Sequence, residues 1–466
     1  MAAAFNKLFA KVDMTEGNPA KKILQFTLPM LIGNIAQQMY NTVGSIIVGK
    51  YVGDDALSAV GSASPILNLL YVLFVGISVG IGIMVSQYFG ARDRENLSKS
   101  IGTSLSLTLF SSLFVMILAV FVTRPLLKLL DTPDKTIEWC YQYLMIFFTG
   151  IAGCAYYNIL GGILRGFGDS VSALIYLLIA TVINIILDYS FVRFLNMEVA
   201  GVALATVIAQ TISAVLCYRK LRSMKDQFDS DLRYLKPSAP HTKMIIRLGI
   251  PSGMTQAIFS MAMLLVQRLT NSFGTVFIAA NVIVMRVDGF AMMPNFSFGT
   301  TMTTYAGQNI GARKLDRVKQ GTRQGLIMSV ATSTILTGAI LLFGKSLMGI
   351  FTNTEELVDL SRRIMGILAV GYIAMAVTQT LSGVMRGAGD TMTPMWISIV
   401  TTVVIRVPLA YLLAHLMEGR TVDELAPGVP GAALAIPLSL LISWLCGAVI
   451  TAVFYRIGKW KEKAII

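Results

Sequence analysis

The chain has 466 residues, of which 55% are hydrophobic and only 14% are charged, and its mean hydropathy is +0.68. This composition excludes a soluble globular protein of this length and indicates an integral membrane protein. The net charge is +13, but no soluble domain exists in which basic and aromatic residues could form a nucleic-acid surface, so no nucleic-acid partner is expected.

Apolar runs long enough to cross a bilayer as helices, about 20 residues each, occur twelve times along the chain. The runs are continuous and do not alternate apolar with polar residues as the strands of a membrane barrel do, so the predicted fold class is all-α. In chain order the predicted spans lie near residues 23–49, 60–88, 100–122, 138–163, 171–195, 199–221, 244–272, 276–307, 320–344, 358–384, 392–416 and 430–456.

The two halves of the chain repeat each other. The stretch GGILRGFGDS, starting at Gly161, returns 221 positions later as SGVMRGAGDT, starting at Ser382. At the same spacing, QYFGAR ending at Arg92 returns as QNIGAR ending at Arg313. Six helices per half is an even number, so both halves begin on the same side of the membrane. The sequence therefore predicts two pseudo-symmetric six-helix bundles, related by an axis along the membrane normal, as in secondary transporters.

The distribution of Lys and Arg predicts the orientation. The termini and the loops after even-numbered spans carry 26 of the 38 basic residues, and the opposite loops carry 10. By the positive-inside rule both termini are expected in the cytoplasm, in a multi-pass protein of the bacterial cytoplasmic membrane. The expected domains are bundles 1–221 and 243–466, joined by a basic cytoplasmic linker, 222–242, that lies on anionic lipid headgroups.

Two carboxylates lie deep in predicted spans, Asp188 in the fifth and Asp288 in the eighth. An ionisable group at bilayer depth costs about 2.5 to 3.5 kcal/mol, so it persists mainly where it faces a cavity and has a function. Asn184 precedes Asp188 by one helical turn and shares its helix face. For Asp288 we expect Arg406 of the eleventh span as partner, and Pro294 predicts a bend in the eighth span.

Further side chains inside the spans are candidates for lining a substrate pocket. Amides are suited to a hydrated pocket, although they also join membrane helices by hydrogen bonds. Methionine adapts to ligands of many shapes, although it also fills cores. The candidates are Asn34, Gln37 and Asn41 of the first span, Asn158 of the fourth, and Met292 and Met293 of the eighth.

Histidine and cysteine give no sign of catalysis or metal binding. His241 and His415 are far apart in the sequence and from any cluster of acids, and the four cysteines form no CxxC pattern. A metal site, a cofactor and a catalytic constellation are therefore not expected, and an enzyme is disfavoured.

Several stretches of the sequence resemble one known protein family, and the resemblance covers essentially the whole chain. The stretch LPMLIGNIAQQMYNTV in the first span, GQNIGAR after the eighth, RGxGD after the fourth and tenth, and NIILDY in the fifth resemble the multidrug and toxic compound extrusion (MATE) family. The resemblance implies a V-shaped pair of six-helix bundles. It also implies a monomer that exports cationic or amphiphilic small molecules in exchange for protons or sodium ions.

Individual residues match the family pattern. Gln37, Asn158, Asn184 and Asp188 match cation-site positions of the first half, whereas Asp288 and Arg406 match polar positions of the second half in prokaryotic members. One departure concerns the first span. Prokaryotic relatives commonly carry an aspartate where MYNTVGSIIVG places Gly44, so the first half retains a single acid for coupling.

Two other transporter classes remain as alternatives. A flippase for lipid-linked sugars, from the same superfamily, would line its cavity with several Arg and Lys. Here only Arg286 and Arg406 lie inside predicted spans, which favours a cationic or neutral cargo. A major facilitator is compatible with the helix number and the parallel repeat, and GARDRENLSKS resembles one of its loops, but the Gly-Arg-Arg that follows in that family is missing.

Overall fold

The computed structural model describes residues 11–129, 132, 134–417 and 429–465. The helices of the first half are α2 (Pro19–Tyr51), α3 (Asp54–Ala91), α4 (Arg94–Leu129), α5 (Asp134–Thr149), α6 (Ile151–Gly166), α7 (Ser170–Arg193) and α8 (Glu198–Arg222). The linker contains a 3-10 helix, η1 (Leu232–Leu235). The helices of the second half are α9 (Ala239–Ser272), α10 (Gly274–Ala291), α11 (Met293–Gly311), α12 (Leu315–Gly349), α13 (Glu355–Gly387), α14 (Met392–Ser398), the π-helix η2 (Ile399–Arg406), α15 (Val407–Met417), the 3-10 helix η3 (Gly431–Leu434), α16 (Ala435–Ile457) and the 3-10 helix η4 (Lys459–Glu462).

Each of the twelve predicted spans coincides, within the described residues, with one helix or one interrupted helix. By length and hydropathy, ten helical stretches of this part of the chain could cross a membrane, and the bent pair α5 and α6 makes an eleventh. The remaining predicted span is α2, which is helical as expected. The predicted all-α membrane fold is therefore confirmed.

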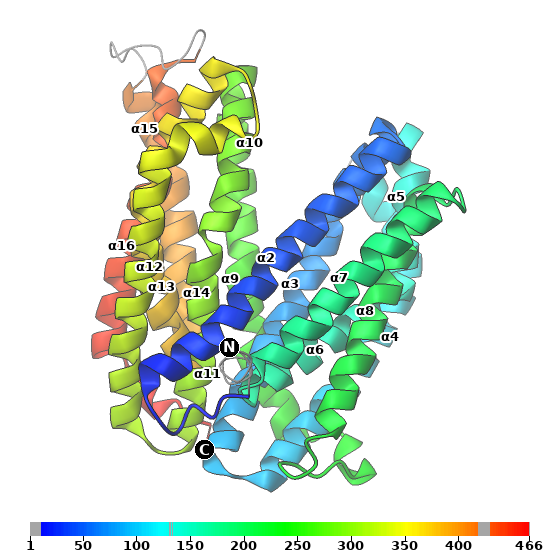
Figure 1. The fold of residues 1–466 in the computed structure, drawn as a ribbon, viewed down its shortest axis with the longest axis vertical. Helices are drawn as coiled ribbons and strands as arrows, with labels where there is room; N and C mark the ends of the chain where they lie inside the picture. Colours follow the sequence, from blue (N-terminus) through cyan, green and yellow to red (C-terminus); the bar gives the residue numbers. More distant parts are fainter. Residues whose placement is uncertain (1–10, 130–131, 133, 418–428, 466) are drawn as a thin grey trace, which may run out of the picture.

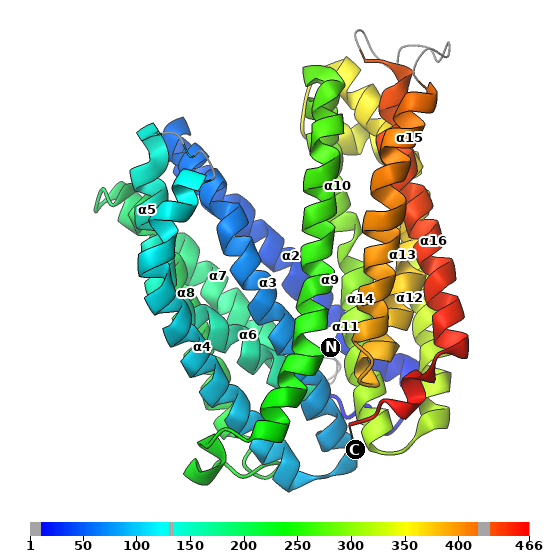
Figure 2. The same cartoon turned by 180° about the vertical axis from the view of Figure 1, so that it is seen from behind.

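The helices form two bundles that meet at one end and diverge toward the other, so the molecule has the shape of a V (Figure 1). One arm contains α3 to α8 and the other α9 to α16, and both chain ends lie where the arms meet (Figure 2). We refer to this end as the closed end.

The first helix of each half packs on the second helix of the opposite half. Helix α2 lies on α11, where the Thr27 hydroxyl donates to Thr301 Oγ1 at 2.9 Å. In the equivalent contact of the repeat, α9 lies on α3, and a Cβ at Gly80 would stand 2.7 Å from the backbone nitrogen of Gly249. Small residues one turn apart allow such close approach of membrane helices. The halves are thus interlocked at the closed end.

We expect Gly76→Ala to lower the melting temperature of the detergent-solubilised protein. A Cβ at Gly76 would overlap backbone atoms of Gly253, which cannot move aside as a side chain can, and overpacking typically costs about 1–3 kcal/mol. Gly338→Ala in α12 is the matched control, because, apart from its chain neighbours and its own helix backbone, no heavy atom of the described structure lies within 4 Å of where a Cβ would stand. Alanine there favours a helix by about 1 kcal/mol. Equal melting temperatures for the two variants would contradict the close α3–α9 contact.

The repeated motifs form equivalent turns at the closed end. Arg92 follows the last residue of α3 and Arg313 lies two residues beyond α11, and both have left-handed backbone conformations with φ of 58° and 57°. In the RGxGD turn that follows α6, Gly168 has φ of 85°, a conformation that favours glycine. The next residue, Asp169, caps α7 by accepting from the backbone N–H of Ser172 at 2.9 Å. The second RGxGD turn repeats this arrangement.

Three predicted spans are not continuous helices. The fourth bends by 52° between α5 and α6 at Gly150, where Val207 of α8 occupies the space that a side chain would fill. The eighth is interrupted at Met292, where Pro294 begins the new helix, as the proline predicted. The eleventh contains the π-helix η2 because Pro408, just beyond it, lacks a backbone N–H and clashes with the preceding turn.

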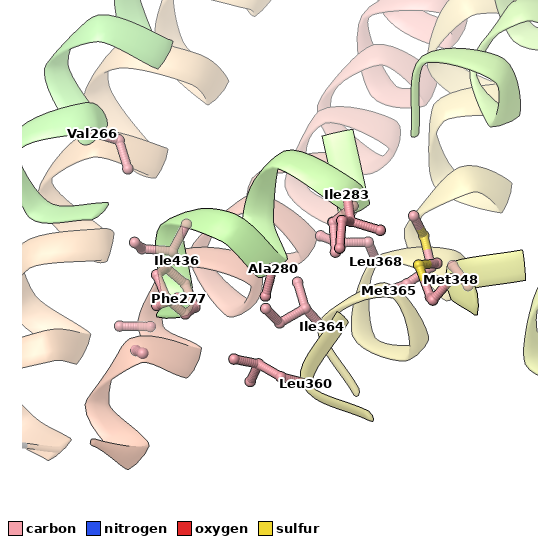
Figure 3. Close-up of a cluster of buried hydrophobic side chains, with 14 of the residues drawn as sticks. Val266, Phe277, Ala280, Ile283, Met348, Leu360, Ile364, Met365, Leu368 and Ile436 are labelled. Atoms are coloured by element: carbon pink, nitrogen blue, oxygen red, sulfur yellow. The ribbon is translucent and has the colours of Figure 1, made fainter. Parts of the chain in front are cut away.

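Four hydrophobic cores stabilise the arms and their junction. One core lies wholly within the second half and one within the first. Figure 3 shows part of the second-half core, where Ala280 of α10 lies near Ile364 of α13. The other two cores combine residues of both halves at the closed end. The closed end is therefore a packed junction.

The linker packs on protein. Arg94 at the start of α4 forms an ion pair with Asp229 at 2.8 Å, and the backbone N–H of Ser238 donates to Thr103 Oγ1 at 3.2 Å. Gly102 of α4 leaves room for the carbonyl of Tyr234. A basic composition does not reveal these protein contacts, and the expected contact of the linker with anionic lipid headgroups stays a prediction.

Candidate functional site

In the first half, the structure brings Asp188 and Asn184 together as predicted. Both lie on α7 and are 1% exposed. In the orientation that satisfies both groups of the amide, Asn184 Nδ2 donates to Asp188 Oδ2 at 2.8 Å and its Oδ1 accepts from the backbone N–H of Thr206 at 3.1 Å. Thr206 of α8 was not foreseen, since a lone threonine in a span carries no distinguishing pattern.

Asp188 has no basic partner among the ion pairs of the described residues. An acidic side chain buried at bilayer depth with a single amide donor lacks a compensating positive charge. Such a carboxyl can bind a proton or a cation from solution, because either one neutralises it.

Two of the other first-half amides form hydrogen bonds within the protein. Asn158 of α6 donates to the backbone carbonyl of Cys154 in its own helix at 2.9 Å. Asn34 of α2 donates to Ser297 Oγ of α11 at 2.9 Å, so it connects the two halves. Gln37 is half-buried, whereas the surroundings of Asn41 and Gly44 within helix α2 are not among the described features. A role of these amides in substrate binding stays a prediction.

In the second half, the direct partner of Asp288 is Tyr372. This tyrosine of α13 is 0% exposed and its hydroxyl donates to Asp288 Oδ1 at 2.8 Å. Arg406 lies close enough for its charge to act on Asp288, but neither forms an ion pair with the other within 4.0 Å. The expected ion pair is thus replaced by a tyrosine hydrogen bond. No sequence pattern marks Tyr372, because a tyrosine in a span is more often an ordinary core residue.

A buried amide extends the polar group of Asp288 and Tyr372. Asn295 of α11 is 0% exposed, donates to the backbone carbonyl of Tyr372 at 3.2 Å and accepts from Ser333 Oγ of α12 at 2.8 Å. The position of Asn295 directly after Pro294, in the middle of a span, could have indicated this residue in the sequence. The residues of this group lie on α10, α11, α12 and α13, so a change in the charge of Asp288 can affect contacts among four helices.

Arg406 ends the π-helix η2. It is 9% exposed, and its Nε is buried without a hydrogen-bond partner in the described part of the chain. π-helical segments occur often at functional sites, because they displace a side chain from the regular helix surface. The structure thus holds a buried cation near Asp288 with part of its hydrogen-bonding capacity unused.

Five further residues inside or at the ends of spans need correction or comment. Arg286 is exposed, so it is not the buried cation that its place inside a span suggested. The arginines of the two RGxGD motifs, Arg165 and Arg386, are half-buried in the last turns of α6 and α13. Met292 and Met293 are 8% and 7% exposed and packed in the interior. Their contact with substrate stays a prediction.

A search of the described residues found no cluster of His, Cys, Asp or Glu that could hold a metal ion. The polar groups around Asp188 and Asp288 remain the candidate functional sites. Each contains one carboxylate with a neutral hydrogen-bond donor, and the group of Asp288 also has the buried cation Arg406 nearby.

A family model named MatE matches residues 29–190 and again residues 251–412. The two matches are displaced by 222 positions, in agreement with the repeat found in the sequence, and together they cover more than half of the chain. This chain belongs to the MATE family. The predicted V-shaped two-bundle architecture is thereby confirmed.

Relatives of known name span almost the whole chain. The probable multidrug resistance protein YoeA of Bacillus subtilis is 30% identical over 397 residues, which are 84% of this chain and 86% of that protein. The probable multidrug resistance protein NorM of Thermotoga maritima is 24% identical over 452 residues, 96% of this chain and 94% of that protein. A structure solved as the outward-facing conformation of a multidrug resistance MATE family transporter has a TM-score of 0.88 and 23% identity, with 96% and 97% of the chains covered.

Proposed function

We propose that this MATE family protein is a secondary active multidrug exporter. It exchanges cationic or amphiphilic small molecules for protons or sodium ions by alternating access. The observation that carries the proposal is the buried carboxyl of Asp188, which has an amide donor but no basic partner among the described residues. The names of the relatives, which include a multidrug export protein MepA of Staphylococcus haemolyticus, support multidrug efflux.

A single carboxyl that binds either the coupling ion or the cationic cargo couples the movement of one to that of the other. When a proton or sodium ion occupies Asp188, the buried charge is neutral and the protein can change conformation without moving an uncompensated charge. A cationic cargo competes for the same negative charge from the other side of the membrane. Ion and cargo then travel in opposite directions, because binding of one favours release of the other.

The shape of the molecule supports an outward-facing state. The arms diverge away from both chain ends (Figure 1), and the excess of Lys and Arg places the chain ends in the cytoplasm. The diverging ends then face the outside, where an inward-directed proton or sodium gradient supplies the coupling ion.

Dye transport in everted membrane vesicles tests the proposal. A fluorescent cationic dye would be supplied outside, and the vesicles would be energised by a pH gradient or, separately, by a sodium gradient. Accumulation of dye under one gradient supports the exporter and identifies the ion. Absence of accumulation under both, together with movement of a labelled lipid-linked sugar, would support the flippase.

The topology is testable with an impermeant maleimide on intact cells. Cysteines placed at Arg313 and Ser230 are expected to be protected, because the turn after α11 and the linker after α8 lie at the closed end (Figure 1), which we place in the cytoplasm. Cysteines at Asp131 and Thr421, which lie outside the described residues, are expected to react, because the positive-inside rule places these loops outside. Labelling at position 313 in intact cells would reverse the orientation.

A further inference from the structure

Two glutamines occupy equivalent positions of the repeated motif and lie at the closed end. They are Gln87 in QYFGAR and Gln308 in QNIGAR, 221 positions apart, and both are 0% exposed. Glutamine amides buried so completely in a membrane protein need partners for both of their polar atoms. The structure supplies these partners twice, with the same geometry.

The amide nitrogen of each glutamine binds the RGxGD turn of the opposite half. Gln87 Nε2 of α3 donates to the backbone carbonyl of Gly387 at 2.8 Å, and Gln308 Nε2 of α11 donates to that of Gly166 at 2.9 Å. The glycines are equivalent residues of the two motifs. Each bond therefore crosses from one half to the other.

The amide oxygen of each glutamine binds a terminal segment. Gln308 Oε1 accepts from the backbone N–H of Met14 at 3.0 Å, and Gln87 Oε1 accepts from that of Ile465 at 2.8 Å. The two ends of the chain are unrelated in sequence, yet they use the same acceptor at pseudo-symmetric positions. The repeat alone does not explain this agreement, since neither terminal segment belongs to it.

The terminal segments also pack against the glycines of the two RGxGD turns. The backbone N–H of Val12 donates to the carbonyl of Gly168 at 3.0 Å, and a Cβ at Gly168 would overlap the Val12 carbonyl. In the second half, a Cβ at Gly389 would stand 2.5 Å from the carbonyl of Lys463. Both turns are thus shaped to receive a backbone segment from a chain end.

Further contacts hold each segment in place. The Met14 carbonyl accepts from Asn309 Nδ2 at 3.0 Å and from Arg317 Nε at 3.1 Å. On the other side, Lys463 Nζ lies 3.4 Å from Asp390 Oδ1. The N-terminal segment is therefore fixed to the second half as well as to the first-half turn, so it bridges the arms.

The helices that carry the glutamines touch where these bonds form. A Cβ at Gly90 of α3 would overlap the carbonyl of Gln308, and a Cβ at Gly311 of α11 would overlap that of Gln87. Opening of the closed end must separate α3 from α11. That movement must break both glutamine bonds to the opposite turns.

We propose that Gln87 and Gln308, together with segments 11–15 and 463–465, form two latches that hold the closed end shut in the outward-facing state. The glutamines are positioning residues, which act on the population of closed and open conformations and not on cargo directly. This inference rests on the proposed function in one respect, because alternating access requires the closed end to open. The latches determine how often the closed end opens.

Thiol labelling tests the latches without any transport measurement. Ser86→Cys in a background that lacks Cys140, Cys154, Cys217 and Cys446 supplies the reporter thiol, because Ser86 is 1% exposed and packs against Gly307 in the α3–α11 contact. The labelling rate with N-ethylmaleimide in proteoliposomes would be measured with and without Gln87→Ala and Gln308→Ala. Gln324→Ala in α12 is the matched control, since its Oε1 has no partner to lose in the described structure.

We expect the double glutamine variant to label at least about tenfold faster than its parent, which corresponds to a loss of about 1.4 kcal/mol from the closed state. The control is expected to label at the rate of the parent. If the glutamine variants do not fold, a chain ending at Glu462 removes one terminal segment alone and is expected to give a smaller acceleration. Unchanged labelling in a folded double variant, or in the truncated chain, overturns the latches.

The failure of the latches and the failure of the proposed function are distinguishable. A double variant that exposes the reporter thiol at position 86 in a protein that moves no dye supports the latches and counts against export. A double variant that exports dye while this reporter thiol stays protected overturns the latches and leaves export in place.

Discussion

Asp188→Asn is expected to abolish gradient-driven export while the protein still reaches the membrane. Asparagine keeps the shape of the side chain and remains compatible with the Asn184 amide, but it cannot bind a proton or attract a sodium ion. Dye export under an imposed gradient is therefore expected to fall to the level of membranes without the protein. The measurement is the initial export rate, normalised to the amount of protein in the membrane.

Asp359→Asn is the matched control for this variant. Asp359 is an exposed residue of α13 that lies 3.9 Å from Lys345, and exposed ion pairs contribute about 0–1 kcal/mol. Its conversion to an amide is expected to leave export unchanged. Full export by Asp188→Asn would remove this carboxyl from the coupling mechanism.

Asp288→Asn is expected to reduce export severely, and Arg406→Gln in the same chain is expected to restore part of it. Loss of the carboxylate leaves the guanidinium of Arg406, 9% exposed, without a nearby anion, and a buried uncompensated charge is strongly destabilising. Replacing the arginine removes that charge. The measurement is the export rate of the two single variants and the double variant at equal protein amounts.

The export rate of the double variant distinguishes between two roles of Asp288. Partial recovery means that the carboxylate mainly balances Arg406 and orients Tyr372, whose hydroxyl donates to it at 2.8 Å. A double variant as inactive as Asp288→Asn alone would assign Asp288 a direct part in coupling. Unimpaired export by the single variant would contradict both roles.

The spans, the repeat and the turns between them could be predicted from the sequence, because each depends on local composition. An apolar run of sufficient length has few alternatives in a bilayer, and the RGxGD and GAR motifs encode their own backbone conformations. The pairing of Asn184 with Asp188 was predictable for the same reason, since residues one turn apart share a helix face.

Contacts between distant helices could not be predicted in this way. The close packing of α9 on α3 depends on Gly80 and Gly249, whose contact no local pattern indicates. The partner of Asp288 was expected to be a charge because opposite charges attract, but the structure places the neutral Tyr372 there. The close approach of Val207 of α8 to the bend at Gly150 joins residues that are far apart in the sequence. Tertiary packing decides each of these features.

Reciprocal coupling in proteoliposomes tests the exchange of cargo for ion most directly. Purified protein would be reconstituted without any ion gradient, and a gradient of a cationic dye alone would be imposed while internal pH and internal sodium are recorded. We predict that the dye gradient drives one of these ions against its own gradient in the opposite direction, and that Asp188→Asn abolishes this movement. Dye movement without any ion movement in the wild-type protein would contradict antiport.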